Sequence, residues 1–238
     1  MVIHRSSATR AVISRSALAS SAKEAVAAGG GIADLRRDAY GHGLLTVARA
    51  VLGAGVSGVL VDGEEQQRLL EAHGLRATVS EEPDIDPGLL YGLPDESVPD
   101  RIPVMRLAGR VMSLKRLHRG EAVSYGYTHR AESDTTIALV TGGYAQAVVR
   151  ALGNRAHVEV QGELHPIVGR VAMDVCVVDL QDPGAMSSDA APIGAETTFF
   201  GGKGPARHAL GEWIASTGLT AAELVCAAGL RASHVEEE

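Results

Sequence analysis

The segment from residue 36 to residue 43 concentrates side chains that can take part in chemistry, and it reads Arg-Arg-Asp-Ala-Tyr-Gly-His-Gly. Arg36 carries a guanidinium that stays protonated at physiological pH, so it is a very poor imine-forming amine, although its planar group suits oxyanions. Asp34 lies two residues earlier and shares one face of an extended strand with Arg36. The spacing therefore predicts an ion pair between these two side chains, of the surface kind that contributes little to stability.

The glycines of the same segment are explained by backbone conformation. Gly41 and Gly43 fit a turn between a strand and a helix, where positive φ angles favour glycine. Tyr40 belongs to this turn, and we expect His42 to be a structural hydrogen-bonding residue rather than a base. On the residues alone, a strand-to-helix turn accounts for the whole segment.

The first part of the chain alternates between short apolar strands and helices. A short apolar run lies at 11–13; strands are expected at 32–35 and 56–61, and helices at 17–28, 44–52 and 64–72. Ser16 is a plausible N-cap of the first helix, which the three glycines at 29–31 end. This alternation predicts parallel strands joined by crossover helices.

The pattern changes beyond an acidic, proline-bounded segment at 80–87, which reads as a linker. Further strands are expected at 104–114, 135–140, 157–160, 167–171, 175–180 and 197–200, with helices at 208–216 and 221–228. Short strands with turn residues between them predict a β-sandwich or barrel. The switch at the proline-rich stretch 94–103 divides the chain into residues 1–98 and residues 99–238.

Three segments in the second half carry specific motifs. Residues 121–130 read EAVSYGYTHR, residues 142–145 read GGYA, and residues 166–174 read PIVGRVAMD. They resemble the patterns G-E-x-V-[SG]-Y-G-x-T-[YF], I-G-Y-A-D and P-I-V-G-R-[VI]-[CS]-M-D of the alanine racemase family, whose members depend on pyridoxal phosphate (PLP) and have fold type III. The resemblance extends over residues 102–228 and implies a C-terminal alanine-racemase-type β-domain.

The first half resembles the family only in part. Residues 36–43 are similar to the end of the motif V-V-K-A-[DN]-A-Y-G-H-G, in which the lysine forms a Schiff base with PLP, and Arg36 stands at the lysine position. Residues 86–92 resemble R-[PI]-G-[IL]-x-x-Y-G, which lies near the end of the family's (β/α)₈ barrel. Such a barrel typically takes about 250 residues. The expected fold class is therefore α/β plus β, with a truncated (β/α) barrel-like N-terminal part that cannot close within one chain.

The resemblance also implies roles in holding the cofactor. Tyr40, Gly88 and Leu89 match residues that contact the PLP phosphate. Asp86 aligns with an arginine that holds the pyridine nitrogen in the family, so an acidic residue stands where a basic one is usual.

Two further positions concern catalysis and the substrate. Tyr125 matches the tyrosine that acts as the second catalytic base, and Met173 matches a residue whose backbone amide holds the substrate carboxylate. A half-buried packing tyrosine with its hydroxyl in water is the alternative for Tyr125.

Composition limits the remaining function classes. The net charge of −7 argues against a nucleic-acid partner, which usually requires a basic face. Cys176 and Cys226 provide neither a disulfide framework nor metal-ligand spacing, so no metal is expected. The first ten residues do not resemble a signal peptide, and no apolar window reaches 18 residues, so a cytoplasmic protein without membrane association is expected.

Two functional hypotheses follow, from different classes. The first is a degenerate racemase, a pseudoenzyme that cannot form the PLP Schiff base and holds PLP, if it binds, without a covalent bond. The second is an active PLP-dependent alanine racemase or related amino-acid isomerase whose site is completed by another chain. Family members build each active site from the barrel of one subunit and the β-domain of the other, which implies a homodimer. A structural domain without a ligand is a third interpretation.

Overall fold

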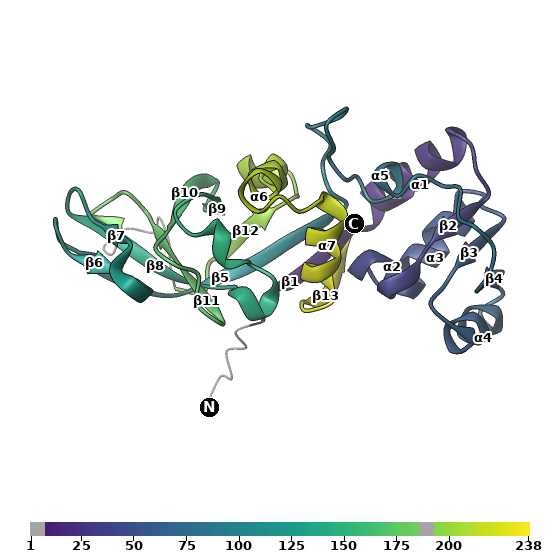
Figure 1. The fold of residues 1–238 in the computed structure, drawn as a ribbon, viewed down its shortest axis with the longest axis horizontal. Coiled ribbons are helices and arrows are strands. Elements are labelled where there is room, and N and C mark those ends of the chain that lie inside the picture. Colours follow the sequence, from purple (N-terminus) through teal and green to yellow (C-terminus); the bar gives the residue numbers. More distant parts are fainter. Residues whose placement is uncertain (1–7, 186–192) are drawn as a thin grey trace.

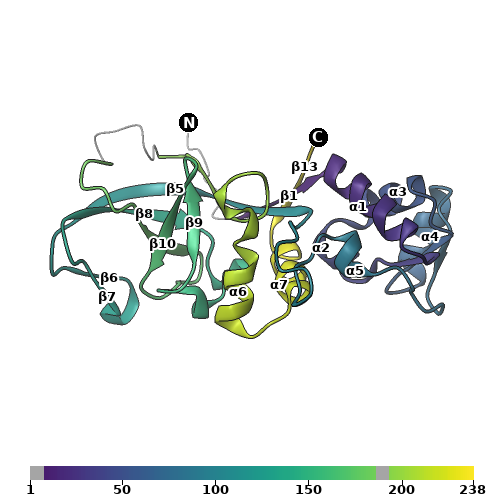
Figure 2. The ribbon, with the colours of Figure 1, turned by 90° about the horizontal axis from the view of Figure 1, so that it is seen from above.

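The computed structural model describes residues 8–185 and 193–238, and these residues form an elongated molecule with a β barrel at one end and an α/β layer at the other (Figure 1, Figure 2). The helices α6 and α7 lie between the two ends in both views. One large hydrophobic core runs through both parts, and it includes Leu224, Val225 and Ala228 of α7. The two parts are therefore packed together rather than joined by a bare linker.

The α/β layer is built on a three-stranded parallel sheet with the strand order β2–β3–β4. Its strands are β2 (Ile32–Asp34), β3 (Gly58–Leu60) and β4 (Ala77–Thr78), and its helices are α1 (Arg15–Ala27), α2 (Arg36–Gly41), α3 (Leu44–Gly53), α4 (Glu64–Ala72) and α5 (Pro87–Leu90). The strands do not close on themselves, as expected for a truncated barrel-like layer. The helices expected at 17–28, 44–52 and 64–72 are confirmed within two residues at each end.

The cap of the first helix differs from the expectation. Ser14, not Ser16, is the N-cap of α1, and its hydroxyl accepts a hydrogen bond from the Ala17 N–H at 3.2 Å. Ser14 has an extended backbone, whereas Ser16 already lies inside the helix, where its side chain cannot take the capping position.

The barrel is a closed ring of six antiparallel strands. They are β5 (Met105–Leu117), β8 (Thr135–Thr141), β9 (His157–Val160), β10 (Glu163–Val168), β11 (Val175–Asp179) and β12 (Glu196–Phe200). The long strand β5 closes the ring because β12 pairs with one edge of it and β8 with the other. The sequence predicted either a β-sandwich or a barrel, and the structure shows a barrel.

The apolar run at 11–13 forms strand β1 (Arg10–Ser14), which does not belong to the parallel sheet. It pairs antiparallel with β5 and parallel with β13 (Ser233–Glu237), and thus extends the sheet of the barrel. Its three central residues, Ala11, Val12 and Ile13, are buried, which requires neighbours on both edges and cover on both faces. An apolar triplet fits either sheet, so the sequence did not distinguish them.

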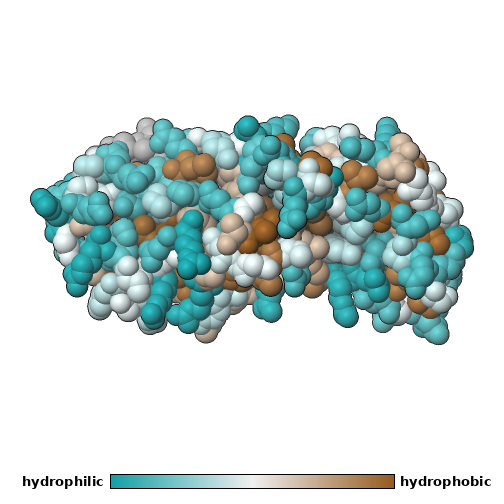
Figure 3. Space-filling view, turned by 45° about the horizontal axis from the view of Figure 1, so that its top comes forward, coloured by the Kyte–Doolittle hydropathy of each residue, from teal (hydrophilic) through white to brown (hydrophobic). Residues whose placement is uncertain are grey.

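Two helices, α6 (Leu210–Thr217) and α7 (Ala221–Gly229), follow the barrel, and both were expected from the sequence within two residues. Trp213 of α6 is buried against Phe199 and Phe200 of β12, with its ring edge-on to both at 6.2 and 5.2 Å between centroids. Figure 3 shows hydrophobic side chains gathered near the middle of the molecule's length, around these helices. Among the described residues no helix is long and apolar enough to cross a membrane.

Candidate functional site

Two carboxylates lie at the carboxyl ends of neighbouring parallel strands. Asp34 is the last residue of β2, and Asp62 follows β3 by two residues. Asp34 and Leu60 are paired in the β2–β3 register, so both carboxylates reach the same edge of the sheet. Ligands of open parallel sheets bind at this edge, outside the carboxyl ends of the strands.

The predicted ion pair between Asp34 and Arg36 is present, and its geometry is bidentate. The Arg36 Nε and Nη2 atoms donate to the two Asp34 carboxylate oxygens at 2.9 and 2.7 Å, and the Arg36 backbone N–H donates at 3.1 Å. The Asp34 side chain is only 6% exposed, whereas that of Arg36 is 51% exposed. The pair is thus half-buried, unlike the surface pair that the sequence suggested.

The segment after Arg36 forms a left-handed turn. Residues 37–40 all have φ of 54° or 55°, and Gly41 continues the turn with φ of 75°. This conformation costs roughly 1–2 kcal/mol per non-glycine residue. Side chains hold the turn in place, because Asp62 accepts the Arg37 N–H and Asp38 accepts the Leu44 N–H, each at 2.7 Å.

Three rings pack beneath this turn. The Tyr91 ring lies 4.9 Å from the Tyr40 ring and 4.6 Å from the His42 ring, between centroids, and its hydroxyl donates to the Asp34 carbonyl. His42 is fully buried, and burial lowers its pKa to about 4. Its Nδ1 lies 3.1 Å from the carbonyls of Ala39 and Tyr40, which agrees with the structural role expected for it.

Helix α7 forms the opposite wall of a pocket of about 320 Å³ over these residues. The pocket is lined by Asp34, Arg36, Arg37, Tyr40, Asp62, Ala222, Glu223 and Cys226. Burial raises the pKa of the Tyr40 hydroxyl and that of the Cys226 thiol. At neutral pH the pocket therefore presents a phenol, a thiol and charged groups that already have partners.

The sequence did not single out Asp62, Glu223 or Cys226 as pocket residues. Asp62 could have been found, because it follows a buried strand just as Asp34 ends one. Cys226 and Glu223 come from a helix almost 190 residues away, and nothing in their local pattern distinguishes them from a helix surface.

The resemblance places Asp86, Gly88 and Leu89 around the cofactor, but in the structure these residues already make other contacts, within α5 or with the core. Asp86 is the N-cap of α5, and its Oδ1 accepts the Gly88 N–H at 2.7 Å. Leu89 is partly buried against the core. None of the three lines the pocket that contains Arg36 and Tyr40.

Tyr125 and Met173 lie together at a second site. They line a pocket of about 470 Å³ with Tyr144, Arg150 and residues 171–175. Tyr125 follows β6 (Ala122–Val123) and begins the 3-10 helix η1 (Tyr125–Tyr127), which ends shortly before β7 (His129–Arg130). Tyr125 is 71% exposed and Met173 is 55% exposed, so the half-buried packing role does not describe Tyr125.

The two sites are separate within one chain, because no residue lines both pockets. Figure 1 and Figure 2 place β6 and β7, which flank Tyr125, at the outer end of the barrel, whereas α2 lies in the α/β layer on the other side of α7. The structure therefore brings Arg36 together with Tyr40, and Tyr125 together with Met173, but it does not bring the two pairs together.

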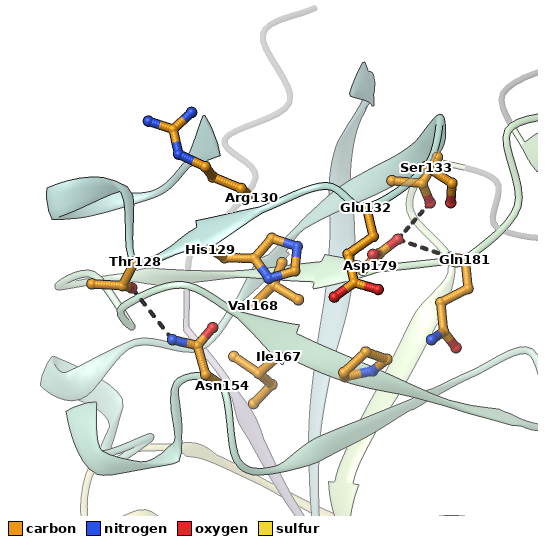
Figure 4. Close-up of a pocket in the computed structure, with 12 residues that line it drawn as sticks. Thr128, His129, Arg130, Glu132, Ser133, Asn154, Ile167, Val168, Asp179 and Gln181 are labelled. Carbon is orange, nitrogen blue, oxygen red and sulfur yellow. Dashed lines mark hydrogen bonds between the residues drawn. The ribbon is translucent and has the colours of Figure 1, made fainter. Parts of the chain in front are cut away.

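A larger pocket of about 550 Å³ lies next to β7 and was not anticipated from the sequence. Figure 4 shows His129 and Glu132 on one side and Gln181 on the other, while the Arg130 guanidinium points away and donates to the Gly120 carbonyl. Its floor is formed by residues 166–168. No group of His, Cys, Asp or Glu suited to a metal ion occurs here or elsewhere in the described part of the chain.

Comparison with known proteins identifies relatives of this chain. The profile described as "Alanine racemase, C-terminal domain" matches residues 104–236. The alanine racemase of Treponema pallidum is 37% identical over 161 residues, which is 63% of this chain and 41% of that protein. The alanine racemase of Mycolicibacterium vanbaalenii is 49% identical over 78 residues, or 33% of this chain and 20% of that protein. The chain thus spans about two-fifths or less of the curated relatives it matches.

Solved structures agree in fold at low sequence identity. The alanine racemase from Streptomyces coelicolor A3(2) superimposes with a TM-score of 0.80 at 19% identity, over 97% of this chain and 98% of that one. The enzyme from Streptomyces lavendulae gives a TM-score of 0.81 at 18% identity, over 99% and 98% of the two chains. Together with the profile match over more than half of the chain, the motifs and the closed six-stranded barrel lead to one conclusion: this chain belongs to the alanine racemase family.

Proposed function

We propose that this chain is a degenerate alanine racemase that neither forms a Schiff base with PLP nor racemises alanine by itself. One observation carries the proposal: the residue at the family's lysine position is Arg36, and its guanidinium is held by both oxygens of Asp34. Racemisation on PLP depends on a covalent link that lets the cofactor act as an electron sink. A guanidinium cannot supply that link.

The other residues implied by the resemblance fit PLP poorly. The Gly88 N–H, a proposed phosphate donor, is taken by Asp86, and the Tyr40 hydroxyl lies 3.4 Å from the Asp34 carboxylate. A phosphate bound in the pocket of Arg36 and Tyr40 would lie near the carboxylates of Asp34 and Asp62 as well as near the guanidinium of Arg37. These contacts favour weak, non-covalent binding of PLP at most.

The proposal is tested by spectroscopy and by a racemisation assay. Purified protein is mixed with PLP, and the visible absorbance of an imine and borohydride-fixed PLP on the protein are measured together with conversion of L-alanine to D-alanine. We expect no absorbance band from an enzyme-bound imine, no fixed label on residue 36 and no racemisation. The same outcome is expected for Arg36→Lys, because the parallel sheet has only three strands in the described chain. A yellow, active Arg36→Lys protein would contradict the proposal.

A second candidate function has one specific observation in its favour. Tyr125 and Met173 are exposed and adjacent, and among the described residues neither the Tyr125 hydroxyl nor the Met173 N–H has a hydrogen-bonding partner. A base and a carboxylate-binding amide presented in this way suit a site completed by another chain that carries the missing lysine. Mixing this protein with a full-length racemase, with Tyr125→Phe as the matched control, tests the idea. A Tyr125-dependent rise in racemisation would favour this function over the degenerate one.

A further inference from the structure

Asp34 accepts more hydrogen bonds from Arg36 than an ion pair with a single contact would provide. Three N–H groups of one residue, Nε, Nη2 and the backbone amide, all donate to its two oxygens. Burial alone would raise the pKa of Asp34, but the hydrogen bonds and charge of Arg36 outweigh it, and the net pKa is lowered. A buried carboxylate is thus kept ionised by one neighbouring cation.

The remaining charged groups around the pocket have other partners. Asp62 binds Arg37, through the backbone N–H at 2.7 Å and the guanidinium Nε at 3.7 Å. Glu223, on α7, caps its own helix by accepting from the Thr220 N–H and hydroxyl at 2.8 Å. Tyr40 and Cys226 are the other titratable groups that face Arg36, and burial raises the pKa of each, so both are neutral at pH 7.

We infer that Asp34 is a positioning residue that holds a protonated side chain at position 36, so the loss of imine chemistry rests on two residues and not on Arg36 alone. The inference builds on the proposed function and deepens it. An imine forms from a neutral amine, and an opposite charge within about 4–6 Å raises the pKa of an amine by roughly 1–3 units. Each unit makes the neutral form tenfold rarer. Asp34 would therefore suppress the reactivity of a lysine placed at position 36.

The chain suits a direct measurement because it contains only three lysines, Lys23, Lys115 and Lys203. In Arg36→Lys, reductive ¹³C-methylation gives four lysine signals, and an NMR pH titration reports the pKa of each. The one signal that the wild-type spectrum lacks belongs to the introduced lysine. No cofactor is needed, so the result is independent of whether PLP binds.

We expect the pKa of the introduced lysine to lie at or above the ordinary value of about 10.4 in the single variant. In Asp34→Asn/Arg36→Lys, which keeps the shape but removes the charge, we expect a pKa lower by roughly 1–3 units. The matched control Asp62→Asn/Arg36→Lys removes the other carboxylate of the pocket, which pairs with Arg37 and makes only a smaller Coulomb contribution at position 36, so the pKa of the introduced lysine should fall much less than in the Asp34 double variant.

Two outcomes would overturn the inference. One is a pKa of the introduced lysine well below the ordinary value in Arg36→Lys, which would mean that Asp34 does not control this position. The other is an equal shift in the Asp34 and Asp62 double variants, which would indicate a general field of the pocket. If the Asp34 double variant does not fold, the pKa of the introduced lysine in Arg36→Lys alone still tests the inference. Racemisation assays test the proposed function separately, since they can fail or succeed whatever the pKa at position 36.

Discussion

At the scale of the residue, Arg36 and Asp34 differ in exposure, and this difference decides which substitution is more costly. Arg36→Ala leaves the buried Asp34 carboxylate without its cation, and we expect a loss of about 2 kcal/mol in the free energy of unfolding. Asp34→Ala leaves a half-exposed guanidinium that water can solvate, so its cost should be smaller. Urea unfolding of both variants measures the difference, with Arg68→Ala, from an exposed pair on α4, as a neutral control.

If Asp34→Ala cost as much free energy of unfolding as Arg36→Ala, or more, the buried Asp34 carboxylate would not be the group that the pair stabilises. The sequence predicted this pair from a spacing of two residues. It did not predict that Asp34 is buried, because burial depends on tertiary contacts, such as that between α2 and α7, which no local pattern shows.

His42 makes stability depend on pH. Its pKa falls from about 6.5 in the unfolded chain to about 4 in the fold, so the unfolded state binds the extra proton between these values. The contribution of neutral His42 is complete above about pH 6.5 and decreases as the pH falls toward about 4. Between about pH 7.5 and about pH 5 we expect a loss of about 2 kcal/mol from this residue.

Urea unfolding at both pH values measures that loss, and His42→Phe serves as the comparison because it keeps an aromatic ring beside Tyr91 without a titrating group. The variant should show a flatter pH dependence. Burial also lowers the pKa of His165. Because His165 is present in both proteins, its effect on the pH dependence cancels in the comparison. Parallel pH profiles for the two proteins would rule His42 out as the source.

At the scale of the element, α2 and α7 approach each other through glycine. A Cβ atom on Gly229 would overlap the Gly41 carbonyl oxygen, which is backbone and cannot rotate away. We expect Gly229→Ala to force α7 away from the turn and to destabilise the fold by about 2 kcal/mol or more. Thermal unfolding checks this, with Gly211→Ala in α6 as the matched control.

A Cβ on Gly211 meets no atom within 4 Å, so its substitution should be neutral or slightly stabilising through helix propensity. Similar melting temperatures for the two variants would mean that the α2–α7 contact adapts. The sequence predicted α7 and the glycine-rich turn separately, each from local pattern. Their contact could not be predicted, because nothing local relates residue 41 to residue 229.

Elements with clear periodicity were predicted well and those set by tertiary contacts were not. Five of the six barrel strands and α3, α4, α6 and α7 were found because apolar spacing and turn residues mark them, whereas β10, expected at 167–171, spans Glu163–Val168. The left-handed turn in α2 was missed because three of its four non-glycine residues, Arg37, Ala39 and Tyr40, have no preference for that conformation. Strand β13 was missed because its acidic sequence, SHVEE, reads as a solvated tail, although Glu236 and Glu237 bind Thr46 and Arg106.

At the scale of the whole molecule, the arrangement predicts self-association. The parallel sheet ends at β2 and β4 without closing, and the barrel presents Tyr125 and Met173 to solvent. A head-to-tail homodimer would bring the outer end of one barrel to the α/β layer of the second copy, and we expect a dimer in sedimentation velocity at micromolar concentration. Tyr125→Glu should weaken it, whereas Leu164→Glu, an exposed apolar site on β10, should not. A monomer at all concentrations would contradict the expectation.

The pairing of β1 with β13 has a consequence for how the chain is made. About 220 residues separate the two strands, so the pairing can form only after that length of chain has been synthesised and a long loop has closed. Until then one edge of the buried strand β1 offers unpaired backbone groups, to which a strand of another nascent chain can add. Once β13 has docked, the edge of the sheet carries Glu236 and Glu237 instead, and their charge discourages further strand addition. The acidic strand thus changes an aggregation-prone intermediate into a protected product.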